Sequence, residues 1–216
     1  MIHKKGLLFK NRDDAAEQLK GVLPIEMMKL EEWTVIATSS NSVGLAMNIA
    51  EEIGAKLDFI YSSKVLAPEN KECEVAIVTE IEEIVIHEEL IKAFDIDLKY
   101  VYAKAKKNYD KDIKPFLKKY KDNNKLGNLE GKNVLLVDEG LNTGLTMMAC
   151  IKTAITLGAK SVSVAVPVIP DLTVNDIEAI ADDLYFVYHP SHFIDIDFYY
   201  DEYEELKIDE IKKIYK

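Results

Sequence analysis

The chain has 216 residues, of which 48% are hydrophobic and 30% are charged, and its formal net charge is −11. This length suits one α/β domain across residues 1–216, or a domain with a small appendage. The negative charge argues against non-specific binding of nucleic acid, which needs a basic surface. The sequence contains no apolar run of about 18 residues, so no membrane span is predicted.

The first elements in chain order form a β–α–β unit. Residues 11–23 predict a helix with Asn11 as its N-cap. Residues 33–38 form the short apolar run of a buried strand, residues 43–55 have helical periodicity, and residues 57–63 return to strand character. This order predicts a parallel pair of strands joined by a crossover helix.

Two β-rich runs follow, at residues 73–80 and 82–89, and their short connection predicts a hairpin added beside the parallel sheet. Residues 99–125 then contain ten lysines and three aspartates. Apolar residues recur there at helical spacing, and Pro115 indicates that this helix is kinked or begins near Asp112. We expect the lysines to form a solvated helix face; the alternative is a cationic surface near an anionic substrate.

The remaining elements again alternate. We expect strands at residues 133–137, 161–169 and 184–189, and helices at residues 144–158 and 173–181. The tail from residue 194 is acidic and aromatic and ends in a predicted short helix. The sequence therefore predicts a single α/β domain, whose mostly parallel, twisted sheet is flanked by helices and carries an added β-hairpin and a small C-terminal hood.

The N-terminus and the cysteines bear on the compartment. The N-terminal residues contain a three-residue apolar patch, which is too short for a signal peptide. The two cysteines, Cys73 and Cys150, are far apart and lack the spacing of metal ligands, so we expect two buried, reduced thiols. These features predict a cytoplasmic protein.

Two loops that follow predicted parallel strands lead directly into helices, at residues 39–44 and 138–146. Ligands of such sheets bind beyond the carboxyl ends of the strands. In the second loop, glycines let the backbone approach a ligand, Thr143 and Thr146 add hydroxyls, and a helix N-terminus offers N–H groups. This loop predicts a phosphate site, although it has neither a P-loop nor a dinucleotide-binding sequence.

Two carboxylates, Asp138 and Glu139, directly precede this phosphate loop. Carboxylates beside a phosphate site can accept hydrogen bonds from vicinal sugar hydroxyls, or hold Mg²⁺ through its water shell. A sugar 5-phosphate would use both parts of the site.

The stretch VLLVDEGLNTGLTM, residues 134–147, resembles the phosphoribosyl diphosphate (PRPP) motif of the type I phosphoribosyltransferases. That motif has four apolar residues, two acidic residues, a short variable stretch, then Thr-Gly and a hydroxyl residue. Residues 9–19, 51–80, 165–170 and 189–203 are similar, in the same order, to a bacterial branch of this family. The resemblance covers most of the chain.

The resemblance implies a type I phosphoribosyltransferase fold and transfer of the 5-phosphoribosyl group to a nitrogenous base or amine, with release of pyrophosphate. It implies that Asp138 and Glu139 engage the ribose hydroxyls and steady Mg²⁺ indirectly, with no direct protein ligand to the metal. The implied 5-phosphate loop consists of Gly140, Leu141, Asn142, Thr143, Gly144, Leu145 and Thr146. The implied pyrophosphate site consists of the loop Ser39, Ser40, Asn41 and Ser42, approached by Lys64. The resemblance also favours a homodimer.

The pyrophosphate loop departs from the family pattern. Related proteins have a Pro-Arg-Gly-Gly-type loop where this chain has the sequence SSNS, so the loop lacks a positive charge and a glycine pair. The second hypothesis is therefore a non-catalytic regulatory protein that binds PRPP or a nucleotide. Asn142 stands where that branch has a small residue, and its amide could crowd the phosphate or add a donor.

Other residues are assigned to structural roles. His87, His189 and His192 have no metal-ligand partners at helical spacing, so we expect structural or surface roles for them. Met147 and Met148 are expected in the core. An aromatic run could stack on a base, pack internally or form a dimer contact, and we expect packing; it comprises Phe193, Phe198, Tyr199, Tyr200 and Tyr203.

Overall fold

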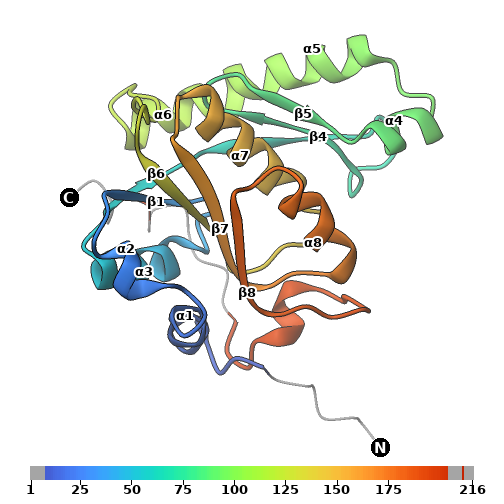
Figure 1. Ribbon diagram of the computed structural model, residues 1–216. Coiled ribbons are helices and arrows are strands. Elements are labelled where there is room, and N and C mark those ends of the chain that lie inside the picture. The colour runs from blue at the N-terminus through green and yellow to red at the C-terminus, as the bar shows by residue number, and fades with distance from the viewer. Residues whose placement is uncertain (1–7, 204–210, 212–216) are drawn as a thin grey trace, which may run out of the picture.

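The structure is a computed structural model that describes residues 8–203 and residue 211. A five-stranded, all-parallel sheet lies at its centre, with the strand order β2-β1-β6-β7-β8 (Figure 1). In chain order these strands are β1 (Trp33–Ala37), β2 (Lys56–Phe59), β6 (Asn133–Val137), β7 (Ser161–Val168) and β8 (Asp183–Tyr188). The predicted parallel sheet and the parallel pairing of the first β–α–β unit are confirmed.

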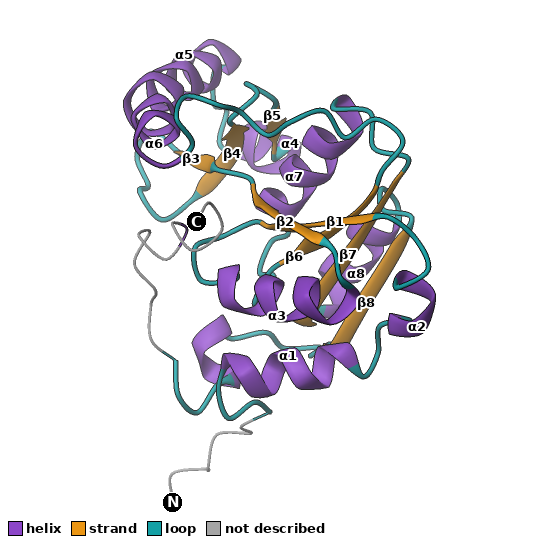
Figure 2. Ribbon diagram, turned by 90° about the vertical axis from the view of Figure 1, so that its left-hand side faces the viewer, coloured by secondary structure: helices purple, strands orange, loops and turns teal. Residues whose placement is uncertain are grey.

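Helices cover both faces of this sheet; they are α1 (Arg12–Lys20), α3 (Val43–Ile53), α7 (Leu145–Thr156) and α8 (Asp171–Glu178). Val35 and Leu135 share one core cluster with α1 and α3, whereas Ile36 and Leu136 share another with α7 and α8. Figure 2 shows α1 and α3 on one side of the sheet and α7 on the other. Successive strand residues face opposite sides, so the central strands of a sheet covered on both faces are nearly continuous apolar runs.

The predicted N-cap of the first helix is confirmed, and a glycine ends the helix α3. The Asn11 side chain accepts a hydrogen bond from the Asp14 amide at 3.0 Å, which caps α1. Gly54 has φ +68° and ends α3 in the left-handed conformation, where glycine avoids the strain of a Cβ atom. Two short helices, α2 (Ile25–Met28) and α4 (Glu88–Ala93), were not predicted, and α4 takes the end of the run predicted as a strand.

A second, antiparallel sheet consists of β3 (Ser62–Leu66), β4 (Glu74–Thr79) and β5 (Ile84–Ile86). It packs on α7, where Ile77 and Val85 contact the cluster that contains Ala149. The predicted hairpin is β4–β5. The prediction of a single strand at residues 57–63 is wrong. This run contains the end of β2 and the beginning of β3, so it links the two sheets.

A buried ion pair holds the joint between the two sheets. Tyr61 and Glu80 bond to each other twice: the Tyr61 amide donates to the Glu80 carboxylate at 2.9 Å, and the Glu80 amide donates to the Tyr61 carbonyl at 3.0 Å. The Lys121 ammonium donates to Glu80 at 2.8 Å and to the Phe59 carbonyl at 2.9 Å. Because both side chains are buried, these bonds compensate their desolvation and fix where the chain leaves the parallel sheet. Lys121 therefore does not belong to a solvated helix face.

The lysine-rich segment is helical from Leu98 onward. It consists of α5 (Leu98–Asn108), a π-helical turn η1 (Tyr109–Ile113) and α6 (Lys114–Tyr120). A start near Asp112 is therefore wrong. The π-helical turn directly precedes α6, whose residue Pro115 has no N–H for the α-helical ladder, and such turns accommodate an interruption of this kind. A 3-10 turn, η2 (Ile196–Tyr199), lies in the tail, and the short helix expected after it falls largely outside the described residues.

Candidate functional site

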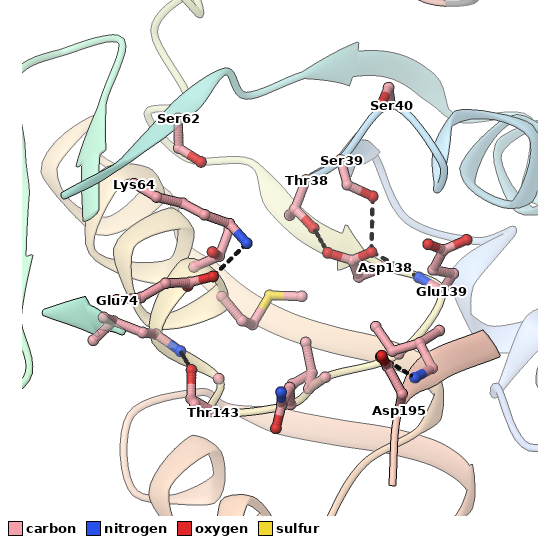
Figure 3. Close-up of a pocket in the computed structure, with 18 of the residues that line it drawn as sticks. Thr38, Ser39, Ser40, Ser62, Lys64, Glu74, Asp138, Glu139, Thr143 and Asp195 are labelled. Atoms are coloured by element: carbon pink, nitrogen blue, oxygen red, sulfur yellow. Dashed lines mark hydrogen bonds and ion pairs between the residues drawn. The ribbon is translucent and has the colours of Figure 1, made fainter. Parts of the chain in front are cut away.

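Two loops diverge at the carboxyl edge of the parallel sheet, between β1 and β6. From β1 the chain continues to the edge strand β2, whereas from β6 it continues to β7 on the opposite side of the strand order. Such a switch point leaves a crevice between the loops. A cleft of about 610 Å³ lies here, and Figure 3 shows side chains that line it.

Asp138 lies at the centre of this crevice, one residue after β6. Its carboxylate accepts hydrogen bonds from the Thr38 hydroxyl at 2.6 Å, the Ser39 hydroxyl at 2.9 Å and the Glu139 amide at 2.8 Å (Figure 3). The pKa of Asp138 is raised to about 6, mainly by burial and also by the Glu139 charge, whereas the hydrogen bonds from Thr38, Ser39 and the Glu139 amide oppose the rise. No cation contacts this carboxylate among the described residues, so it titrates closer to neutral pH than an exposed aspartate.

Glu139 is bound differently from its neighbour. Its Oε2 pairs with the Arg12 guanidinium at 2.9 Å. Its Oε1 accepts from the Asn41 amide group at 2.9 Å and from the Tyr203 hydroxyl. Its backbone carbonyl accepts from the Tyr200 hydroxyl at 2.7 Å. The side chain is only 4% exposed, so the ion pair with Arg12 compensates the cost of burying this carboxylate.

Arg12, Thr38 and Tyr203 were not among the predicted site residues. Arg12 and Tyr203 are 127 and 64 residues from Glu139 in the sequence, so no local pattern connects them. Backbone hydrogen bonds join the segments around residues 9 and 200, including one from the Phe9 amide to the Tyr199 carbonyl at 3.0 Å. The only sequence signal is that both residues lie in segments resembling the same protein family.

The predicted 5-phosphate loop, residues 140–146, joins β6 to α7 and lines the cleft. Within the described part of the chain, several consecutive amides of this loop and the first turn of α7 donate to no other residue; these are the amides of Asn142, Thr143, Gly144, Thr146 and Met147. Such amides at a helix N-terminus carry partial positive charge and suit a phosphate. The geometry is therefore suited to an anion, and the assignment of the 5-phosphate to this loop stays a prediction.

Close packing fixes the shape of this loop. Gly144 has φ +72°, and a Cβ atom there would lie 2.7 Å from Cγ2 of Thr173. At Gly140 a Cβ atom would lie 2.7 Å from Cγ1 of Val168. The Thr173 hydroxyl also donates to the Asn142 carbonyl at 2.8 Å. Glycine is required at both positions because side chains of β7 and α8 pack directly against the loop backbone.

The loop of residues 39–42 is internally hydrogen bonded. The Ser39 amide donates to the Ser42 hydroxyl at 3.1 Å, and the Ser42 amide donates to the Ser39 hydroxyl at 3.2 Å. The Ser42 hydroxyl donates to the Ser39 carbonyl at 2.9 Å. Of the four predicted pyrophosphate residues, Ser39 and Ser40 line the cleft, Asn41 binds Glu139, and Ser42 is buried.

Lys64 lies on β3, on the opposite wall of the cleft from Asp138 (Figure 3). Its ammonium pairs with the Glu74 carboxylate of β4, so its charge is already neutralised. The cleft lining among the described residues contains one lysine against five carboxylates, which are Glu72, Glu74, Asp138, Glu139 and Asp195. The lysines of residues 99–125, a fully described segment, contribute no lining side chain.

The other residues considered from the sequence have mostly structural surroundings. Cys150 is buried as expected, whereas Cys73 is only partly buried and lines the cleft. His189 pairs with Asp171 at the start of α8. Tyr199 and Tyr200 are buried, which agrees with packing rather than base stacking for these two rings. Met147 is buried, whereas Met148 is only partly buried.

Two kinds of feature are absent from residues 8–203 and 211. None of the helices described is long and apolar enough to cross a bilayer. The same part of the chain contains no group of three His, Cys, Asp or Glu side chains placed to hold a metal ion.

Comparisons with known proteins show the family of this chain. The family model for the phosphoribosyl transferase domain matches residues 2–202. The Mycobacterium tuberculosis protein named "Putative phosphoribosyl transferase Rv0571c" is 24% identical over 204 residues, which are 94% of this chain and 45% of that protein, so this chain spans about half the length of that relative. The crystal structure of TT1426 from Thermus thermophilus is 25% identical, with a TM-score of 0.77, and the match covers 96% of this chain and 97% of that one.

Proposed function

This chain belongs to the phosphoribosyl transferase domain family, and we propose that it binds the 5-phosphoribosyl group of PRPP, or of a nucleoside monophosphate, in the cleft between β1 and β6. We further propose that it transfers this group to a nitrogenous base or amine. The bond from the anomeric carbon to pyrophosphate breaks, and its electron pair leaves with pyrophosphate. The acceptor nitrogen forms the new bond and loses a proton to water.

The observation that carries the proposal is the open run of amides in residues 142–147 beside the Asp138 carboxylate. The amides suit the 5-phosphate, and the carboxylate can accept a hydrogen bond from a ribose hydroxyl. Glu139 lies next to it on the same cleft wall. A phosphate site and a hydroxyl acceptor one loop apart fit a ribose 5-phosphate.

The charge of the cleft bears on the metal. Five lining carboxylates and one lysine, counted over the described residues, would repel a substrate with several phosphates unless a cation accompanied it. Oxygen ligands suit Mg²⁺, which keeps most of its water. Asp138 would hold its water shell, and the metal would neutralise charge on the departing pyrophosphate.

A second candidate function is non-catalytic binding of PRPP or a nucleotide as a regulatory signal. The internal hydrogen bonds between Ser39 and Ser42 favour it, because they use amides that would otherwise face the pyrophosphate. The Lys64–Glu74 ion pair favours it as well, because it neutralises the lysine on the opposite wall. Such a protein would bind ribose 5-phosphate and PRPP almost equally.

Isothermal titration with ribose 5-phosphate, and with PRPP plus Mg²⁺, tests both candidates. We expect ribose 5-phosphate to bind, and tighter binding of PRPP would support the transferase. Equal affinities would contradict transfer and support the regulatory role. Pyrophosphate release with a panel of purine, pyrimidine and amine acceptors then measures transfer directly, and absence of ribose 5-phosphate binding would refute both candidates.

A further inference from the structure

We infer that Asn41 and Tyr203 occupy, at the Glu139 carboxylate, the hydrogen-bonding positions that the ribose hydroxyls take in the complex. Sugar binding must therefore displace them. The inference rests on the proposed function, because it assigns how the ribose enters that same site. The inference makes Tyr203 a determinant of sugar affinity. Tyr203 belongs to residues 199–203, called here the C-terminal segment.

The two donors meet on one oxygen atom. The Asn41 amide group and the Tyr203 hydroxyl both donate to Oε1 of Glu139, while Arg12 holds Oε2. A carboxylate oxygen offers about two lone-pair positions, so Oε1 has no position left for a sugar hydroxyl. The Asn41 amide also donates to the Tyr203 hydroxyl at 3.3 Å. The pair thus resembles two vicinal hydroxyls in its donor pattern.

The tyrosine hydroxyl keeps its proton in this environment. Burial raises the pKa of Tyr203, and the hydrogen bond to the Glu139 carboxylate raises it further. The hydroxyl is therefore a donor at physiological pH, as a sugar hydroxyl is. It competes with the sugar for the same acceptor.

The contacts around Glu139 indicate which groups move. Arg12 is the first residue of the regular helix α1 and holds the other carboxylate oxygen through an ion pair. Tyr200 anchors the C-terminal segment separately, through a 2.7 Å bond to the Glu139 backbone carbonyl. Tyr203 can therefore leave Oε1 while Arg12 and Tyr200 keep Glu139 and the segment in place.

The test uses titration calorimetry with ribose 5-phosphate, 2-deoxyribose 5-phosphate and inorganic phosphate. The variants are Tyr203→Phe and the matched control Tyr200→Phe, which removes a hydroxyl that bonds to the backbone of Glu139 instead of its carboxylate. We expect Tyr203→Phe to bind ribose 5-phosphate about two- to tenfold more tightly, the range of one hydrogen bond. The gain should be smaller for the deoxy sugar and absent for phosphate. Tyr200→Phe should show no gain.

Each alternative outcome has a definite meaning. Unchanged binding by Tyr203→Phe would show that the hydroxyl does not compete with the sugar, and weaker binding would show that it supports sugar binding. Either result would overturn the inference. An equal gain in Tyr200→Phe would attribute the effect to general loosening of the C-terminal segment and would also overturn it. Failure of the unaltered protein to bind ribose 5-phosphate would refute the proposed function itself. If thermal unfolding shows that Tyr203→Phe does not fold, Asn41→Ala tests the second donor with the same expected gain.

Discussion

The loops of residues 39–42 and 140–146 stand at the same edge of the same sheet, and each leads from a parallel strand into a helix. They differ in the hydrogen bonds that their backbone amides donate. In the first loop, the Ser39 and Ser42 amides bond to each other's hydroxyls. In the second, consecutive amides from Asn142 onward donate to no other described residue except at Leu145.

Side-chain chemistry explains the difference. A serine hydroxyl can accept from nearby backbone amides, so Ser39 and Ser42 satisfy each other's amides without a ligand. Glycine has no such group, and at Gly140 and Gly144 the packing of Val168 and Thr173 leaves no room for one. Position in the fold therefore makes a ligand site available, but residue type decides whether its donors remain open.

The largest predicted effect on binding comes from a substitution that distorts the loop of residues 140–146. Gly144→Ala places a Cβ atom at φ +72° and 2.7 Å from Cγ2 of Thr173. We expect stability to fall by about 2 kcal/mol, because strain and a clash add. Ribose 5-phosphate binding should fall on the order of 100-fold, since displacement by about 1 Å costs that much in a positioned site. Chemical denaturation and calorimetry measure the two effects.

A matched substitution controls this experiment. Gly127→Ala makes the same chemical change at a position with open space around the added atom. We expect both stability and binding to stay within error of the unaltered protein. Retention of ribose 5-phosphate affinity in Gly144→Ala would mean that the loop of residues 140–146 does not hold the phosphate.

The next largest effect concerns the carboxylate beside the open loop. Asp138→Asn should weaken ribose 5-phosphate binding by about 1.5–3 kcal/mol, the scale of a hydrogen bond to a charged group. Asp176→Asn, an equal charge change on the exposed face of α8, is the control and should leave affinity unchanged. Equal affinities of Asp138→Asn and the unaltered protein would remove Asp138 from the sugar site.

The same variant has a pH-dependent effect on stability. The pKa of Asp138 rises from 3.8 to about 6 on folding, so the fold favours the protonated carboxyl. Its stabilising contribution is complete below pH 3.8 and is lost as pH rises through 6. Asp138→Asn should thus be more stable than the unaltered protein by about 1–2 kcal/mol at pH 8 and nearly equal at pH 4. A loss of stability that is the same at both pH values would show that lost hydrogen bonds dominate.

Local signals in the sequence predicted one loop well. The apolar run of β6, the carboxylates after it and the Gly-Thr pattern before α7 lie within residues 133–147, so local chemistry fixes them. The surroundings of Glu139 could not be predicted that way. Arg12 and Tyr203 reach it only because the chain ends pair through Phe9 and Tyr200.

The joint between the sheets was missed for a related reason. Residues 57–63 have continuous strand character, and the distant Glu80 and Lys121 bind the backbone where the run divides. A lysine in a segment with nine others is expected to be solvated, and composition does not show which one is buried. Buried polar networks depend on tertiary partners, which periodicity does not reveal.

A smaller effect is expected where α8 supports the open loop. Thr173→Val removes the hydroxyl that donates to the Asn142 carbonyl at 2.8 Å and keeps a similar shape. We expect stability to fall by about 1 kcal/mol and ribose 5-phosphate affinity to fall about two- to fivefold, because one hydrogen bond is lost. Thermal unfolding and calorimetry measure both. Unchanged affinity would show that packing alone holds the loop, and Thr156→Val, on the exposed end of α7, is the control.

The smallest expected effect on binding comes from a substitution in the loop of residues 39–42. Ser42→Ala removes the hydroxyl that accepts from the Ser39 amide, so that amide becomes available to a ligand. We expect PRPP with Mg²⁺ to bind about two- to threefold more tightly, a modest gain because one amide hydrogen bond contributes little net energy. Ribose 5-phosphate affinity should not change, and Ser63→Ala on β3 controls for loss of a serine hydroxyl. A parallel change for both ligands would show that the loop of residues 39–42 does not distinguish the pyrophosphate from the sugar phosphate.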